Sequence, residues 1–155
     1  MSNYATENLR TLALVGHGSC GKTTLIEAML YRAGMIPEMG SIQRGTTMCD
    51  NDLLEKEVGH SIRLAVAHID TAMTDLTPVR IHILDTPGYP DYLGQDMSAL
   101  DAVKSVCAVI DPTKGPELLT RRLMAMAKER GLCRMIVINH MDLSLIHISE
   151  PTRPY

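Results

Sequence analysis

The segment that most constrains the fold lies near the N-terminus and reads Gly16-His17-Gly18-Ser19-Cys20-Gly21-Lys22-Thr23. It matches the pattern G-x-x-x-x-G-K-[ST], in which glycines let backbone N–H groups curl around an anion. The apolar run Thr11–Val15 precedes it, and a helical pattern over Lys22–Arg32 follows. A strand, an anion-binding loop and the positive end of a helix are thus predicted in the order that a phosphate loop requires.

The side chains of this loop have separate expected roles. Lys22 is expected to reach the outer phosphates of a nucleotide, and the Thr23 hydroxyl to ligate Mg²⁺. A chance match in a glycine-containing turn is the alternative, and the strand–helix context disfavours it. His17 and Cys20 lie outside the pattern and are expected to contribute backbone groups. The residues predicted to hold the phosphates are Gly16, His17, Gly18, Ser19, Cys20, Gly21, Lys22, Thr23 and Thr24.

The rest of the chain alternates short apolar runs with helical patterns. Helices are predicted after Pro90 and after Pro116, and strands at Ser61–Ile69, Val79–Leu84, Ser105–Ile110 and Met135–Ile138. Met35–Val58 is polar and aperiodic, which in a compact domain favours a mobile or functional segment. The alternation predicts an α/β fold, a mostly parallel sheet with helices on both faces and a ligand site at the carboxyl ends of the strands.

A second motif, Asp85-Thr86-Pro87-Gly88, follows the predicted strand Val79–Leu84. An acidic residue at a strand tip beside a phosphate loop can hold Mg²⁺, usually through water. Gly88 can bring its N–H close to a terminal phosphate and act as a hinge. Taken alone, D-T-P-G is an ordinary turn. Its place after an apolar strand in a phosphate-loop protein favours the functional interpretation.

A third motif, Asn139-His140-Met141-Asp142, follows the predicted strand Met135–Ile138. The Asp142 carboxylate could accept two hydrogen bonds from N1–H and N2–H₂ of guanine, a donor pair that adenine lacks. Asp142 would then select GTP over ATP. By itself such a motif is also typical of a turn, because Asn and Asp both favour turns. Its order and distance after the first two motifs strengthen the prediction of base recognition.

Composition narrows the function classes. The 155 residues suffice for one domain, and 45% of them are hydrophobic, which excludes an intrinsically disordered chain. A formal charge of −3 argues against general polyanion binding, so no direct DNA binding is expected. Four widely spaced cysteines and the lack of a secretory leader predict a reduced, cytoplasmic protein. No apolar run approaches the ~18 residues of a membrane span.

With these motifs in place, the chain resembles the start of the GTPase domain of elongation factor G, most closely the divergent elongation-factor-G-like branch. The similarity runs from about Leu9 to Asp142 through GHGSCGKTTL, RGTTMCDNDLLEKEVGHSI, DTPGYPDYLG and INHMD. It implies a phosphate-loop GTPase fold that binds GTP and GDP with Mg²⁺, a full-length parent that hydrolyses GTP and acts on the ribosome, and a fragment that by itself is an impaired GTPase. The family's metal-ligating switch threonine corresponds here to Ser61, so the implied metal ligands are Thr23, Ser61 and Asp85. The implied catalytic residues are Lys22, Gly88 and Tyr89.

Two positions depart from the family pattern. Members usually carry His directly after D-T-P-G, where it positions the attacking water, whereas this chain has Tyr89. A phenol in model peptides has a pKa of about 10 and cannot act as an imidazolium at neutral pH. Slow or differently organised hydrolysis is therefore implied. His140 replaces the lysine of the family's N-K-x-D motif, which implies weaker affinity with guanine choice kept by Asp142. His60 in the switch could touch phosphate, but a solvated loop residue is favoured.

The similarity also suggests a boundary within the chain. We expect residues 1–142 to be a partial GTP-binding domain, cut short because a further helix, strand and closing helix would normally follow Asp142. The ending LSLIHISEPTRPY (143–155) resembles in-frame translation of a sequencing adapter, and a genuine short strand with a polar tail is the alternative. Two other functions stay open: an ATP-binding phosphate-loop protein, and a GTP-binding ribosomal regulator without turnover.

Overall fold

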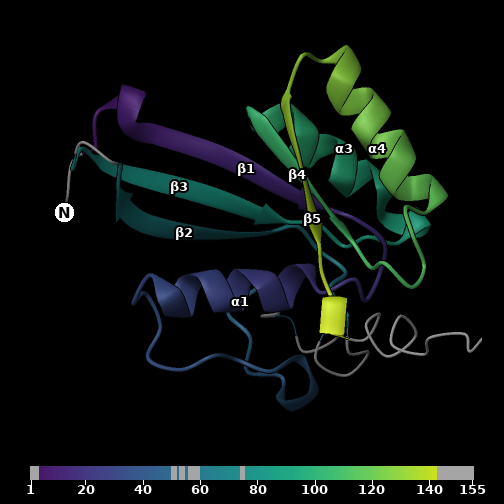
Figure 1. Ribbon diagram of the computed structural model, residues 1–155, viewed down its shortest axis with the longest axis horizontal. Helices are drawn as coiled ribbons and strands as arrows, with labels where there is room; N and C mark the ends of the chain where they lie inside the picture. Colours follow the sequence, from purple (N-terminus) through teal and green to yellow (C-terminus); the bar gives the residue numbers. More distant parts are fainter. Residues whose placement is uncertain (1–3, 50–51, 53–54, 56–59, 74–75, 143–155) are drawn as a thin grey trace, which may run out of the picture.

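Five strands form one sheet in the order β2-β3-β1-β4-β5. The computed structural model describes residues 4–49, 52, 55, 60–73 and 76–142 (Figure 1). Strand β2 pairs antiparallel with β3, while β3, β1, β4 and β5 run parallel to their neighbours. The strands are β1 (Leu9–Val15), β2 (Ala65–Ala72), β3 (Pro78–Asp85), β4 (Ser105–Ile110) and β5 (Cys133–Ile138).

Helices cover both faces of this sheet, as the sequence predicts. Helix α1 (Lys22–Arg32) lies on one face, and α3 (Leu93–Ala102) and α4 (Leu118–Glu129) lie on the other (Figure 1). Short 3₁₀ turns occur at η1 (Thr6–Asn8), η2 (Ile42–Arg44) and η3 (Pro90–Tyr92). The predicted α/β architecture with a mostly parallel sheet is therefore confirmed.

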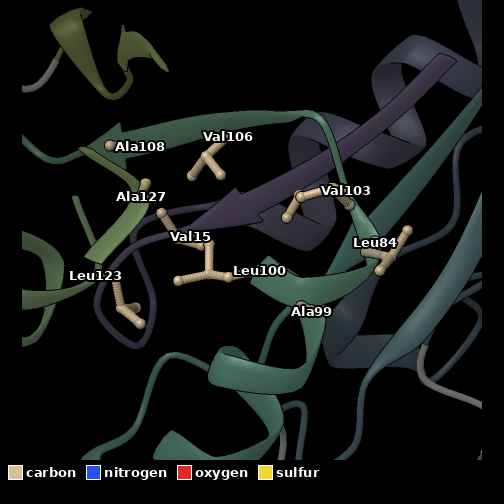
Figure 2. Packing of buried hydrophobic residues seen from close by; sticks show 10 residues of the cluster. Val15, Leu84, Ala99, Leu100, Val103, Val106, Ala108, Leu123 and Ala127 are labelled. Atoms are coloured by element: carbon tan, nitrogen blue, oxygen red, sulfur yellow. The ribbon is translucent and has the colours of Figure 1, made fainter. Parts of the chain in front are cut away.

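The alternating side chains of β1 divide the core into two layers. Ala13 and Val15 belong to one cluster with Leu100 of α3 and Leu123 of α4. Figure 2 shows Val15 beside Leu100 and Leu123. Leu14 points the other way and joins a second cluster that includes residues of α1. A central strand buried on both faces reads as a continuous apolar run, which is why Thr11–Val15 is recognisable in the sequence.

Some boundaries differ from the sequence-based prediction. The predicted strand Ser61–Ile69 begins instead at Ala65, because its first backbone groups bond to side chains and not to a neighbouring strand. Pro90 opens a 3₁₀ turn before α3, and the helix predicted from Pro116 begins at Leu118. The tail at 143–155 and parts of the polar segment 35–58 lie outside the described residues.

The last strand, β5, is poorly covered. Ile136 is 63% exposed and Ile138 56% exposed, although β5 pairs along its length with the buried strand β4. Apolar side chains at such exposure mark sheet surface on which further structure commonly packs. Among the described residues, no helix is both long and apolar enough to cross a bilayer.

Candidate nucleotide-binding site

Segments from all three motifs meet at one end of the sheet. The parallel register places Leu14 of β1 opposite Asp85 of β3, and Ile110 of β4 opposite Ile138 of β5, so the loops that follow these strands leave on the same side. They border a cavity of about 270 Å³. Its lining is Ser19, Gly21, Lys22, Thr23, Thr24, Ile42, Gln43, His60, Ser61, Pro87, Tyr89 and His140.

The first loop wraps around the amine of Lys22. This residue is only 6% exposed, and its Nζ donates to the carbonyl oxygens of Gly16 at 3.1 Å and His17 at 2.9 Å. Gly88 has a φ of +81°, and a Cβ there would overlap both Lys22 Nζ and the Gly16 carbonyl oxygen. The D-T-P-G backbone thus passes directly against the phosphate loop, an approach that requires glycine.

Three side-chain oxygens converge at the start of α1. Thr23 Oγ1 donates to Asp85 Oδ2 at 2.6 Å and lies 3.3 Å from Ser61 Oγ. They come from α1, from the end of β3 and from the segment before β2. Hydroxyl and carboxylate oxygens are the ligand types that Mg²⁺ prefers, so this cluster fits the metal ligands implied by the sequence.

Thr86 does not line the cavity, and His140 is the one residue of the N-H-M-D motif that does. Thr86 is buried and donates to the Leu14 carbonyl oxygen at 2.9 Å, which fixes the turn after β3. Asn139 Nδ2 donates to the Cys20 carbonyl oxygen at 3.0 Å and so ties the last loop to the first. Met141 and Asp142 are exposed and are not among the residues that line the cavity.

His140 is held by a carboxylate from the neighbouring strand end. Its Nδ1 lies 3.1 Å from Oδ2 of Asp111, which follows β4. Hydrogen bonds from Thr113 and then from His140 hold the pKa of the Asp111 carboxyl well below its usual range. His140 therefore takes the place of the family's lysine with a partner of its own.

The side chains of His17 and Cys20 point into the protein. Cys20 is fully buried in the cluster beneath α1, and this burial raises the pKa of its thiol. His17 is 3% exposed with Nε2 3.9 Å from Glu117 Oε1, and burial lowers the pKa of its imidazole. The His17 carbonyl oxygen accepts from Lys22 and the Cys20 carbonyl oxygen accepts from Asn139, while their expected backbone contacts to phosphate stay a prediction.

Sequence reasoning did not include three residues of the cavity in the site. Ile42 and Gln43 come from η2 within the aperiodic segment, where no pattern marks them. His60 was expected in solvent, but it is half-buried, and its ring centroid lies 4.6 Å from that of Tyr89. The position of His60 directly before Ser61 was the one signal that could have indicated it.

Comparison with known proteins agrees with this geometry. Residues 7–153 match the family model described as the elongation factor Tu GTP binding domain. The chain belongs to this family. It is 33% identical over 138 residues to the tetracycline resistance protein TetM from transposon Tn1545 of Enterococcus faecalis, a match that covers 89% of this chain and 21% of TetM. The elongation factor G-like protein of Mycobacterium tuberculosis is 35% identical, over 86% of this chain and 18% of that protein.

A solved structure shows the same fold in three dimensions. A crystal structure of a protein from Thermus thermophilus superposes with a TM-score of 0.75 at 36% identity, covering 83% of this chain and 19% of that one. The resemblance to translation-factor GTPases is therefore confirmed at the level of family and fold. The chain spans about a fifth of the length of these relatives.

Proposed function

We propose that this chain is the GTP-binding part of an elongation-factor-G-like translation factor, which hydrolyses GTP to GDP and phosphate while acting on the ribosome in the cytoplasm. The observation that carries the proposal is the enclosure of Lys22 by the phosphate loop beside the oxygens of Thr23, Ser61 and Asp85. A cation for phosphates next to an oxygen cluster for a metal is what phosphoryl transfer requires.

Each residue then has a role in binding or turnover. Lys22 and the backbone N–H groups of the loop would stabilise negative charge on the phosphates. Thr23, Ser61 and Asp85 would hold Mg²⁺, which when bound neutralises charge that develops on the phosphate oxygens. Gly88 and Tyr89 would form the second switch beside the terminal phosphate.

Base recognition is assigned to Asp142, with Asn139 bracing the loop. The exposed Asp142 carboxylate has no role in the packing of the core, which leaves it available to accept hydrogen bonds from guanine. The Asn139 amide holds Cys20 of the phosphate loop and so fixes the distance between base and phosphate contacts. This division of work supports GTP, rather than ATP, as the ligand.

Competition against labelled GDP tests the proposal. Unlabelled GTP should displace the label from the 155-residue chain far more effectively than ATP, and equal displacement would favour the ATP-binding alternative. Lys22→Ala should abolish binding, whereas Lys128→Ala, an exposed lysine on α4, should leave it unchanged. Phosphate release with and without ribosomes separates a GTPase from a regulator that binds GTP without turnover.

A further inference from the structure

A histidine and a tyrosine from two different segments meet over the phosphate loop. His60 precedes Ser61 in the segment that leads into β2, and Tyr89 follows Gly88 after β3. Their ring centroids are 4.6 Å apart with an interplanar angle of 46°. Both rings line the same cavity as Lys22 and Thr23.

Tyr89 rests on the loop itself. A Cβ added at Gly18 would lie 2.5 Å from Tyr89 Cζ and 2.8 Å from its Oη, so the hydroxyl end of the ring covers the backbone of Gly18. The absence of a side chain at Gly18 is what admits the ring. Tyr89 therefore fills the space beside the loop, and its ring packs against that of His60.

The backbone that follows His60 is fixed by side chains from three other segments. Ser61 Oγ lies 3.3 Å from Thr23 Oγ1. The Ile62 N–H donates to Oε1 of Glu55, a carboxylate that is 4% exposed, and the Ile62 carbonyl oxygen accepts from Nε2 of Gln95 at 3.0 Å. These contacts fix the chain directly after His60, and its imidazole lines the same cavity as Thr23 and Ser61, two of the residues proposed to hold Mg²⁺.

We infer that His60 supplies the imidazole that positions the attacking water, with Tyr89 as its support. This inference rests on the proposed GTPase function. The water oxygen forms a bond to the terminal phosphorus, and the bond from that phosphorus to the bridging oxygen breaks with its electron pair leaving on GDP. One water proton stays on the released phosphate and the other is released to solvent, while the imidazole of His60 holds the attacking water by a hydrogen bond. His60 is thus assigned as a catalytic residue, and Tyr89 as a positioning residue.

Single-turnover hydrolysis of GTP by excess protein tests this inference on the 155-residue chain. His60→Ala should lower the rate of phosphate release by about a hundredfold, a typical loss when a reacting group is no longer held in position. GDP affinity should change less than about threefold, because binding rests mainly on the phosphate loop. The matched control is His68→Ala, an exposed histidine on β2, which should leave both quantities unchanged.

Chemical rescue separates a catalytic role from a structural one. Added imidazole should restore much of the rate in His60→Ala and have no effect on His68→Ala. Tyr89→Phe keeps the ring against His60 and should retain the rate within about threefold, while Tyr89→Ala should lose at least about tenfold without loss of GDP binding.

The possible results distinguish failure of the role of His60 from failure of the proposed GTPase function. Equal hydrolysis by wild type and His60→Ala would overturn the role of His60 and leave the GTPase proposal standing. A slow His60→Ala variant that imidazole does not rescue would overturn it as well. If wild type bound GTP but released no phosphate, the GTPase proposal would fail, and the role of His60 would fail with it.

Discussion

Glu27 offers the sharpest test of how the aperiodic segment is held over the nucleotide cavity. Its side chain lies on α1 and is completely buried. Oε2 accepts from the Gly40 N–H at 2.9 Å, and Oε1 accepts from the Met48 N–H at 2.5 Å. The two bonds secure both ends of residues 40–48, the stretch that brings Ile42 and Gln43 to the cavity.

Glu27→Gln keeps the shape of the side chain and replaces one acceptor oxygen with an N–H₂ group. Either Gly40 or Met48 then faces a donor instead of an acceptor. Losing a hydrogen bond to a charged group costs about 1.5–3 kcal/mol. Taking about 2 kcal/mol, the equilibrium constant for local opening of this segment should rise by about thirtyfold.

Amide hydrogen exchange of Gly40 and Met48, followed by NMR on the native chain, measures this opening directly. At least one of the two amides should exchange about ten to a hundred times faster in Glu27→Gln. Glu38→Gln is the matched control, since it removes the same charge from an exposed position in the same segment. If both amides exchange in Glu27→Gln as slowly as in this control, the anchoring role of Glu27 is refuted.

Three further changes probe the base loop, the charges behind it and the second switch. In the proposed GTP-binding site, Asp142→Asn should shift preference from guanine to xanthine nucleotides, and an unchanged preference in competition binding would exclude Asp142 from base recognition. The pKa of Asp111 is depressed in the folded protein, so its contribution to the free energy of unfolding is present above about pH 4 and is lost as the pH falls below that. Acid titration of unfolding should therefore be shallower for Asp111→Asn than for the exposed control Asp91→Asn, and identical curves would refute the assignment. Tyr89→His should leave phosphate release unchanged or faster, and a fall of about tenfold would show that Tyr89 has a role that an imidazole cannot fill.

The sequence predicts the framework of the site because that framework follows from local rules. Glycine spacing and the flanking apolar strand indicate the phosphate loop around Lys22. Asp85 lies at the carboxyl end of a strand, where ligands bind in parallel sheets. The antiparallel pairing of β2 with β3 also follows from two runs joined by a turn.

The segment between α1 and β2 is different because tertiary contacts determine its path. The carboxylates of Glu27 and Glu55 accept hydrogen bonds from backbone N–H groups of residues further along the chain. A buried acidic residue of this kind looks like any other polar residue in a sequence. The cavity residues that depend on this path, His60 among them, were therefore invisible to periodicity.

The hydrogen bond from Asn139 to Cys20 has a consequence for synthesis of the protein. It joins residues 119 positions apart, and β1, made first, lies between β3 and β4, which are made later. The phosphate loop emerges from the ribosomal exit tunnel long before the partner that braces it. The phosphate loop therefore gains this brace only after Asn139 has left the tunnel, which makes completion of the pocket a late event in folding.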